Sequence, residues 1–170
     1  MNDLNTQNKT GIQVGKFAIV GILNTLIDVS ILNLLVYFSF VATLIVFGQK
    51  FLIANIISVA IAMINSFILN KQWTFKAEEG NIYKQIFQFL AITIVGMFVI
   101  HQIIFNALYY GLPQISNLII SIVHFLKLSG YFSDSFIALN FAKIIAIIGS
   151  LIWNFIGYKF IVFKKKELTF

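Results

Sequence analysis

The sequence predicts an all-α membrane protein: four transmembrane helices in two parallel two-helix repeats, plus a short surface helix between helices 3 and 4. Three observations support this fold class. Hydrophobic residues make up 59% of the 170-residue chain and charged residues only 11%, whereas a soluble domain carries roughly 25% charged residues. Four apolar segments are long enough to cross a bilayer. The ends of the second and fourth segments also resemble each other.

The four apolar segments define predicted spans at about 17–38, 51–69, 86–109 and 137–162. Together they form a transmembrane domain over residues 16–166, between a polar cytoplasmic N-terminus at 1–15 and a cytoplasmic C-terminal end at 167–170. No small-residue cleavage site follows the first apolar run, so we expect a retained helix rather than a signal peptide.

The lysines predict the orientation of the spans. With the N-terminus inside, the cytoplasmic side holds nine of the twelve lysines: Lys9, Lys16, Lys71, Lys76, Lys84, Lys159, Lys164, Lys165 and Lys166. The outer side keeps Lys50 and Lys127, while Lys143 lies within the fourth span. The positive-inside rule therefore places both termini in the cytoplasm of a multi-pass cell-membrane protein. The net charge of +6 then indicates contact with anionic lipid in the bilayer and no nucleic-acid partner.

A shorter apolar stretch lies between the third and fourth spans. Its apolar side chains share one helical face, at Ile115, Leu118, Ile119, Ile122 and Leu126. Its polar side chains lie opposite, at Asn117, Ser121 and His124. This pattern predicts a helix lying on the outer leaflet. A re-entrant segment is the alternative.

The ends of the second and fourth spans indicate an internal repeat. Residues 67–76 align with residues 155–164, and the two share a phenylalanine, an isoleucine, a central lysine, a second phenylalanine and a closing lysine. The starts of the first and third spans match more faintly, with Phe17 against Phe89. A unit with an even number of spans duplicates in parallel. The alternative is that both helix ends carry similar interface anchors.

Several polar residues are placed where a membrane span makes them costly. Asp28 lies near the bilayer midplane, where a carboxylate costs a few kcal/mol and needs a partner inside the bundle. Lys143 is the one intramembrane cation, since Lys159 lies at the cytoplasmic end of its span. Amides add to the set at Asn24, Asn55, Asn65 and Asn154. These residues either hold helices together or line a polar path, and Asp28 is either a path residue or a hydrogen-bonded interior acid.

The cytoplasmic ends of the second and fourth spans are candidate headgroup sites. Lys71 and Lys159 occupy matching positions there and could donate charge-assisted hydrogen bonds to a phosphate. Asn70 and Trp73 adjoin Lys71, and Lys16 is close enough in the predicted topology to contribute. The alternative is that these lysines only anchor their helices at the interface.

The sequence contains no recognisable catalytic motif. It contains no phosphate-binding glycine loop, nucleophile elbow or paired acidic motif. The chain has no cysteine and only two histidines; His101 is expected to be an interior residue, and Glu78 and Glu79 to be solvated. We therefore expect no catalytic residue, no metal and no cofactor.

Three motifs resemble the GtrA family of small four-helix membrane proteins. The first span has a Gly-x-x-Asn-Thr stretch at Gly21–Thr25, and the second ends in Ser-Phe-Ile-Leu-Asn-Lys-Gln-Trp-Thr-Phe at Ser66–Phe75. The fourth span contains Asn154-Phe155 and ends in Val162-Phe163. Lysine replaces the family's usual arginine in the second motif, and Gly157–Lys159 stands where Leu-Asn-Arg is common. The resemblance runs from about Lys16 to Lys166.

The resemblance implies a flippase for an undecaprenyl-phosphate-linked sugar that serves cell-wall polysaccharide or teichoic-acid glycosylation, with membrane glycosyltransferases as partners. The protein would not itself be an enzyme. Because four thin spans enclose little polar volume, we also expect a homo-oligomer. Residues expected to contact the polyprenyl-phosphate-linked sugar are Asn24, Asp28, Asn65, Asn70, Lys71, Trp73, Lys143, Asn154 and Lys159. Two other functions stay open: a non-transporting anchor or scaffold for a glycosyltransferase, and a small ion-coupled exporter.

Overall fold

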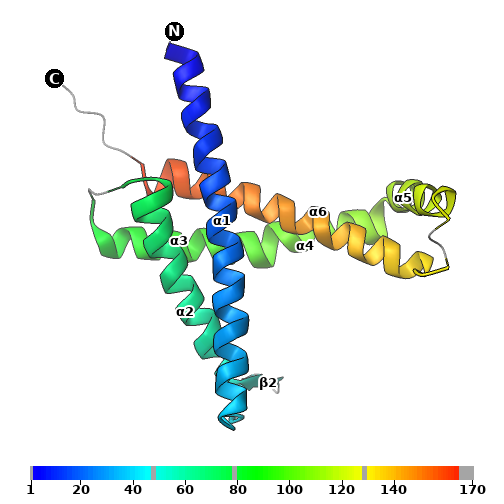
Figure 1. Ribbon diagram of the computed structural model, residues 1–170, viewed down its shortest axis with the longest axis horizontal. Helices are drawn as coiled ribbons and strands as arrows, with labels where there is room; N and C mark the ends of the chain where they lie inside the picture. Colours follow the sequence, from blue (N-terminus) through cyan, green and yellow to red (C-terminus); the bar gives the residue numbers. More distant parts are fainter. Residues whose placement is uncertain (1, 47–48, 78–79, 128–129, 165–170) are drawn as a thin grey trace. The chain divides into compact units, whose positions relative to one another are not determined.

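A computed structural model describes residues 2–46, 49–77, 80–127 and 130–164 of the chain. The predicted C-terminal end, the cytoplasmic Lys165 and Lys166, and the Glu78–Glu79 pair lie outside these residues. The chain divides into two compact units (Figure 1). Unit 1 takes in the described residues up to Asn81, and unit 2 runs from Ile82 to Lys164.

Unit 1 is a helical hairpin whose two helices are joined by a β-hairpin. Helix α1 (Asn2–Tyr37) leads to strands β1 (Thr43–Val46) and β2 (Gln49–Leu52), and α2 (Ile53–Leu69) returns along α1 and ends in a π-helical turn, η1 (Asn70–Thr74) (Figure 1). The strands pair antiparallel with Thr43 opposite Leu52. This hairpin is not predicted from the sequence pattern, and α1 begins within the polar N-terminus rather than at the predicted start of the first span.

Unit 2 repeats the helical hairpin and adds a helix between its two arms. The first arm is α3 (Ile82–Val95), η2 (Gly96–Ile100), α4 (His101–Asn106) and η3 (Ala107–Gly111). Helix α5 (Pro113–Phe125) follows, and α6 (Asp134–Gly157) with η4 (Tyr158–Val162) returns along the first arm. The predicted helix between the third and fourth spans is therefore present as α5.

Two polar contacts fix the start of α6 and its link to α5. The Ser133 side chain accepts a hydrogen bond from the Phe136 backbone N–H and so caps the α6 N-terminus. His124 of α5 lies 2.7 Å from Asp134. Most of the predicted apolar face of α5, including Leu118 and Leu126, is exposed. Its position on the outer leaflet remains a prediction.

Among the described residues, four helices are long and apolar enough to cross a membrane, at Asn8–Tyr37, Ile53–Thr74, Ile82–Gly111 and Asp134–Val162. No more than 28% of the residues are buried in the most apolar stretch of any of them. Helices that leave so many apolar side chains uncovered need lipid as their solvent. They can enter it because their backbone groups are already hydrogen-bonded within the helix. The four predicted spans correspond to these helices.

Small residues bring the two arms of each unit together. In α2 the buried residues Ala54, Ser58 and Ala62 recur every four positions and so lie on one helix face. In α6, Ala142 and Ala146 are both fully buried, and they occupy the positions that the sequence repeat aligns with Ala54 and Ser58. Small side chains let helix backbones approach closely in a membrane. The two units therefore use the same packing at aligned positions.

The ends of the second helix in each unit also match. The π-helical turns η1 and η4 begin at Asn70 and Tyr158, which the sequence repeat aligns with each other. Each turn closes on a buried phenylalanine: the Phe75 N–H donates to the Asn70 carbonyl at 2.9 Å, and the Phe163 N–H donates to the Tyr158 carbonyl at 2.8 Å. The predicted duplication of a two-helix unit is confirmed.

Gly157 marks a close approach of the two arms of unit 2. A Cβ at this position would lie 2.6 Å from the Ile92 side chain, whereas a Cβ at Gly21 of α1 would meet nothing. We therefore expect Gly157→Ala to lower the free energy of unfolding by about 1–3 kcal/mol through overpacking. Gly21→Ala should leave it unchanged or raise it by up to about 1 kcal/mol. Unfolding in detergent measures both, and equal effects would contradict the packing of unit 2.

Candidate functional site: a polar seam in unit 1

The face of α1 that packs against α2 carries polar residues at helical spacing. The polar residues on this face are Lys16, Asn24 and Asp28. The apolar Val20 lies among them and is almost completely buried. At 1.5 Å per residue, Lys16 and Asp28 are about 18 Å apart along the axis. This row of residues, with its partners on α2, forms a polar seam. The seam runs from Lys16, at the start of the predicted first span, to Asp28, at the predicted bilayer midplane.

The carboxylate of Asp28 finds its partner on α2. The Ser58 hydroxyl lies 2.5 Å from Asp28 Oδ1 and donates to it, and the same hydroxyl lies 3.0 Å from the Asn55 carbonyl. Ser58 is fully buried, whereas Asp28 is half-buried. A carboxylate has about four acceptor sites, so a single hydroxyl leaves most of its acceptor capacity for another ligand. Lys143, the intramembrane cation of the predicted spans, belongs to unit 2.

One helical turn from Asp28, two amides bridge the same seam. Asn65 Nδ2 donates to Asn24 Oδ1 at 2.7 Å. Both side chains are half-buried, and each amide has more donors and acceptors than this one bond uses. The two pairs thus place a carboxylate and two amides next to each other in an otherwise apolar hairpin.

The predicted headgroup residues of η1 divide into two groups. Asn70 is buried and donates through Nδ2 to the Ser66 carbonyl at 2.9 Å, so its amide stabilises the end of α2. Lys71 is half-buried and Trp73 is exposed. The Lys16 ammonium lies 5.1 Å from the centroid of the Trp73 ring and donates to the Trp73 carbonyl at 3.3 Å. Lys16 therefore joins α1 to η1.

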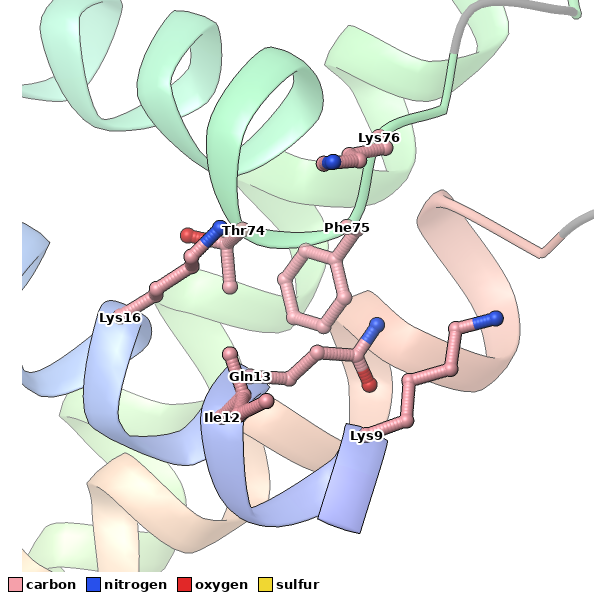
Figure 2. A pocket seen from close by; sticks show the side chains of 7 residues that line it. All are labelled: Lys9, Ile12, Gln13, Lys16, Thr74, Phe75 and Lys76. Atoms are coloured by element: carbon pink, nitrogen blue, oxygen red, sulfur yellow. The ribbon is translucent and has the colours of Figure 1, made fainter. Parts of the chain in front are cut away.

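Lys16 also lines a cavity of about 160 Å³ at this end of unit 1. Figure 2 shows side chains from the start of α1 facing those that follow α2. The lining residues are Lys9, Ile12, Gln13, Lys16, Thr74, Phe75 and Lys76. Of these residues, only Lys16 was predicted to contribute to a headgroup site. The signal for Lys9 was present, because Lys9, Gln13 and Lys16 are spaced to lie on one face of a helix.

The predicted site residues of unit 2 form no matching polar seam. Asn154 is half-buried close to Gly96, and no hydrogen-bond partner for its Oδ1 is found among the described residues. Lys159 lies over the Phe155 and Phe160 rings, at 5.7 and 5.5 Å. Lys143 is exposed on α6.

The sequence repeat shows which residues of unit 2 stand in place of the polar residues of unit 1. Carrying the Phe17–Phe89 match along the first helix of each unit aligns Asn24 with Gly96 and Asp28 with Ile100. Unit 2 instead buries Tyr158, whose hydroxyl lies 2.6 Å from that of Thr93. The two units therefore share the packing of the helical hairpin, whereas the Asp28 carboxylate and the paired amides of Asn24 and Asn65 belong to unit 1.

The described residues contain no group of three or more histidine, cysteine or acidic side chains that could hold a metal ion. The observed features define a helical multi-pass membrane protein, built from a duplicated hairpin, with a polar seam in its first half. The model of the GtrA/DPMS transmembrane domain matches residues 16–163, so the chain belongs to this family. The family relates it to polyprenyl-phosphate-linked sugars. No curated protein sequence matches the chain.

Proposed function

We propose that this protein moves a polyprenyl-phosphate-linked sugar across the cytoplasmic membrane for cell-surface polysaccharide or teichoic-acid glycosylation. The observation that carries the proposal is the seam between α1 and α2. It holds Asp28 paired with Ser58, and Asn24 paired with Asn65, and three of these four side chains are only half-buried. An acid and amides that served only to hold helices together would gain most from complete burial.

The chemistry of the seam suits such a cargo. A sugar hydroxyl can donate to the Asp28 carboxylate and exchange hydrogen bonds with the Asn24 and Asn65 amides. Hydrogen bonds to a charged group contribute about 1.5–3 kcal/mol each. The polyprenyl chain can stay among the lipid tails while only the polar head passes along the seam. Lysines at the cytoplasmic end of unit 1 offer positive charge to the phosphate.

The proposal includes a place for partner enzymes. A glycosyltransferase at the cytoplasmic face would make the lipid-linked sugar, and another at the outer face would consume it. The protein would catalyse no reaction, and both of its termini would be cytoplasmic. Because one two-helix hairpin encloses little polar volume, we also propose a homo-oligomer that completes the path. A fully active monomer in native lipid would contradict that oligomer.

Reconstitution tests the proposed transport. Purified protein is placed in vesicles with a labelled polyprenyl-phosphate sugar, and the label that becomes accessible on the far side is measured. We expect protein-dependent transfer, reduced about tenfold or more by Lys71→Ala, because a charge-assisted hydrogen bond to the phosphate is lost. Lys127→Ala, on the predicted outer side, is the matched control. Transfer no faster than in protein-free vesicles would reject the function.

A further inference from the structure

We propose that the cavity between α1 and the end of η1 is a phosphate-recognition site that takes the headgroup of a polyprenyl-phosphate-type lipid. The cavity is lined by Lys9, Lys16 and Lys76 together with Thr74 and two apolar side chains. The identity of the lipid depends on the proposed function, whereas the recognition of phosphate depends only on the geometry of the cavity.

Three lysines from two segments of unit 1 line this small volume. Lys9 and Lys16 come from α1, while Lys76 comes from the segment after η1 (Figure 2). The seven lining residues include no acidic side chain. The Lys16 ammonium lies over the Trp73 ring, and that of Lys9 points away from the other two in Figure 2. A phosphate in the cavity would therefore draw these flexible side chains toward it and accept charge-assisted hydrogen bonds from them. The positive charge therefore indicates an anionic ligand.

The backbone at Lys76 provides a second, independent observation. Lys76 has φ 50°, in the left-handed region that residues other than glycine, asparagine and aspartate rarely occupy. The turn is held by a 2.8 Å hydrogen bond from the Ala77 N–H to the Lys71 carbonyl. Such conformations cluster at functional sites but also end helices, and Ser39 and Lys127 share a positive φ in this chain. Here the conformation carries the Lys76 side chain to the cavity.

The remaining lining distinguishes a lipid phosphate from a free one. Ile12 and Phe75 add apolar walls beside the lysines (Figure 2), which suits a ligand whose phosphate is joined to a hydrocarbon chain. Thr74 is 3% exposed, and no hydrogen-bond partner for its hydroxyl is found among the described residues. A buried hydroxyl without a partner is destabilising, and this one could bind a phosphate oxygen only after the Thr74 side chain turned toward the cavity.

Trp73 gives a direct measurement of binding. The Lys16 ammonium lies over its ring, so a phosphate that draws Lys16 into the cavity changes the surroundings of the indole. The chain has two tryptophans, and the other, Trp153, lies in α6 of unit 2. In a Trp153→Phe background the fluorescence therefore reports on Trp73 alone.

The experiment uses the full chain in nanodiscs of neutral lipid. Three probes are titrated separately: polyprenyl monophosphate, phosphatidylglycerol and inorganic phosphate. We expect a saturable change in Trp73 fluorescence with polyprenyl monophosphate, at an apparent affinity about tenfold or more above that for the other two. A Lys9→Gln/Lys76→Gln double variant should weaken this binding about tenfold or more. The control Lys84→Gln, which removes one predicted cytoplasmic lysine from unit 2, should leave it unchanged.

A further variant separates recognition from structure. Asparagine tolerates the left-handed conformation better than lysine, so Lys76→Asn should keep or raise the unfolding temperature while it weakens polyprenyl-phosphate binding. A lower unfolding temperature with unchanged binding would assign Lys76 a purely structural role and overturn the site. Equal binding of phosphatidylglycerol or inorganic phosphate, or equal effects of the double variant and Lys84→Gln, would also overturn it. Because binding is measured without transport, wild-type protein that binds but does not transport would reject only the proposed function.

Discussion

Replacing Asp28 with asparagine is expected to reduce transport of a labelled polyprenyl-phosphate sugar to about a tenth of the wild-type rate or less. The asparagine side chain can still accept the hydrogen bond from Ser58, so the α1–α2 seam should keep its packing. What it loses is the charge, and hydrogen bonds from sugar hydroxyls to a carboxylate are stronger than those to an amide by about a factor of two. The transport assay in vesicles measures the loss, and unfolding in detergent checks that the protein is intact.

A matched polar residue on the same helix serves as the control. The Thr25 hydroxyl is exposed and donates to the carbonyl of Gly21 within α1, at 3.1 Å. Thr25→Val removes a hydroxyl beside the amide of Asn24 without touching the seam, and transport should stay within about twofold of wild type because such backbone-directed bonds contribute little. Normal transport by Asp28→Asn would show that the charge of Asp28 is not used.

Replacing Ala54 with leucine is expected to cause the largest loss of stability. Ala54 is fully buried where α2 packs on α1, one helical turn from Ser58. Three additional carbon atoms there should force the helices apart and lower the free energy of unfolding by about 1–3 kcal/mol or more. The separation should also break the hydrogen bond between Ser58 and Asp28, and transport should fall with it.

Ala60→Leu is the matched substitution on the other side of the same helix. Ala60 is exposed on α2, where a larger apolar side chain should meet lipid at no packing cost. Unfolding in detergent should therefore distinguish Ala54→Leu from Ala60→Leu. Similar stability of the two variants would contradict the close approach of α1 and α2 and, with it, the geometry of the seam.

The fold was largely predictable because its main determinants are local. Runs of apolar residues predict helices that span a membrane, and the phenylalanine and lysine pattern at the ends of the second and fourth spans predicted the duplication. The π-helical turns at Asn70 and Tyr158 lie where that alignment places them. The β-hairpin at Thr43–Leu52 was missed because the sequence analysis treated this segment only as a short connection between spans.

The candidate site was predicted in part, and the reason lies in how helices face each other. The sequence marked Asp28 and the in-span amides as costly, yet it could not select their partners, since Ser58 is recognisable as a partner only once the rotation of α2 about its axis is known. The cavity was harder to predict. Lys9 and Lys76 are far apart in sequence and line the same cavity only because α2 returns along α1.

The proposed transport requires a polar seam that is open to a passing headgroup. Because the chain has no native cysteine, the accessibility of the seam can be measured directly with introduced cysteines. A single cysteine is introduced at Asn24, in the seam, or at Ile22, on the exposed face of α1, and its reaction with a water-soluble thiol reagent is timed. We expect the cysteine at Asn24 to react and to be protected by a polyprenyl-phosphate sugar, while the cysteine at Ile22 stays unreactive in lipid. If the cysteine at Asn24 is as inert as that at Ile22, with or without the lipid, the seam is closed and the transport path does not exist.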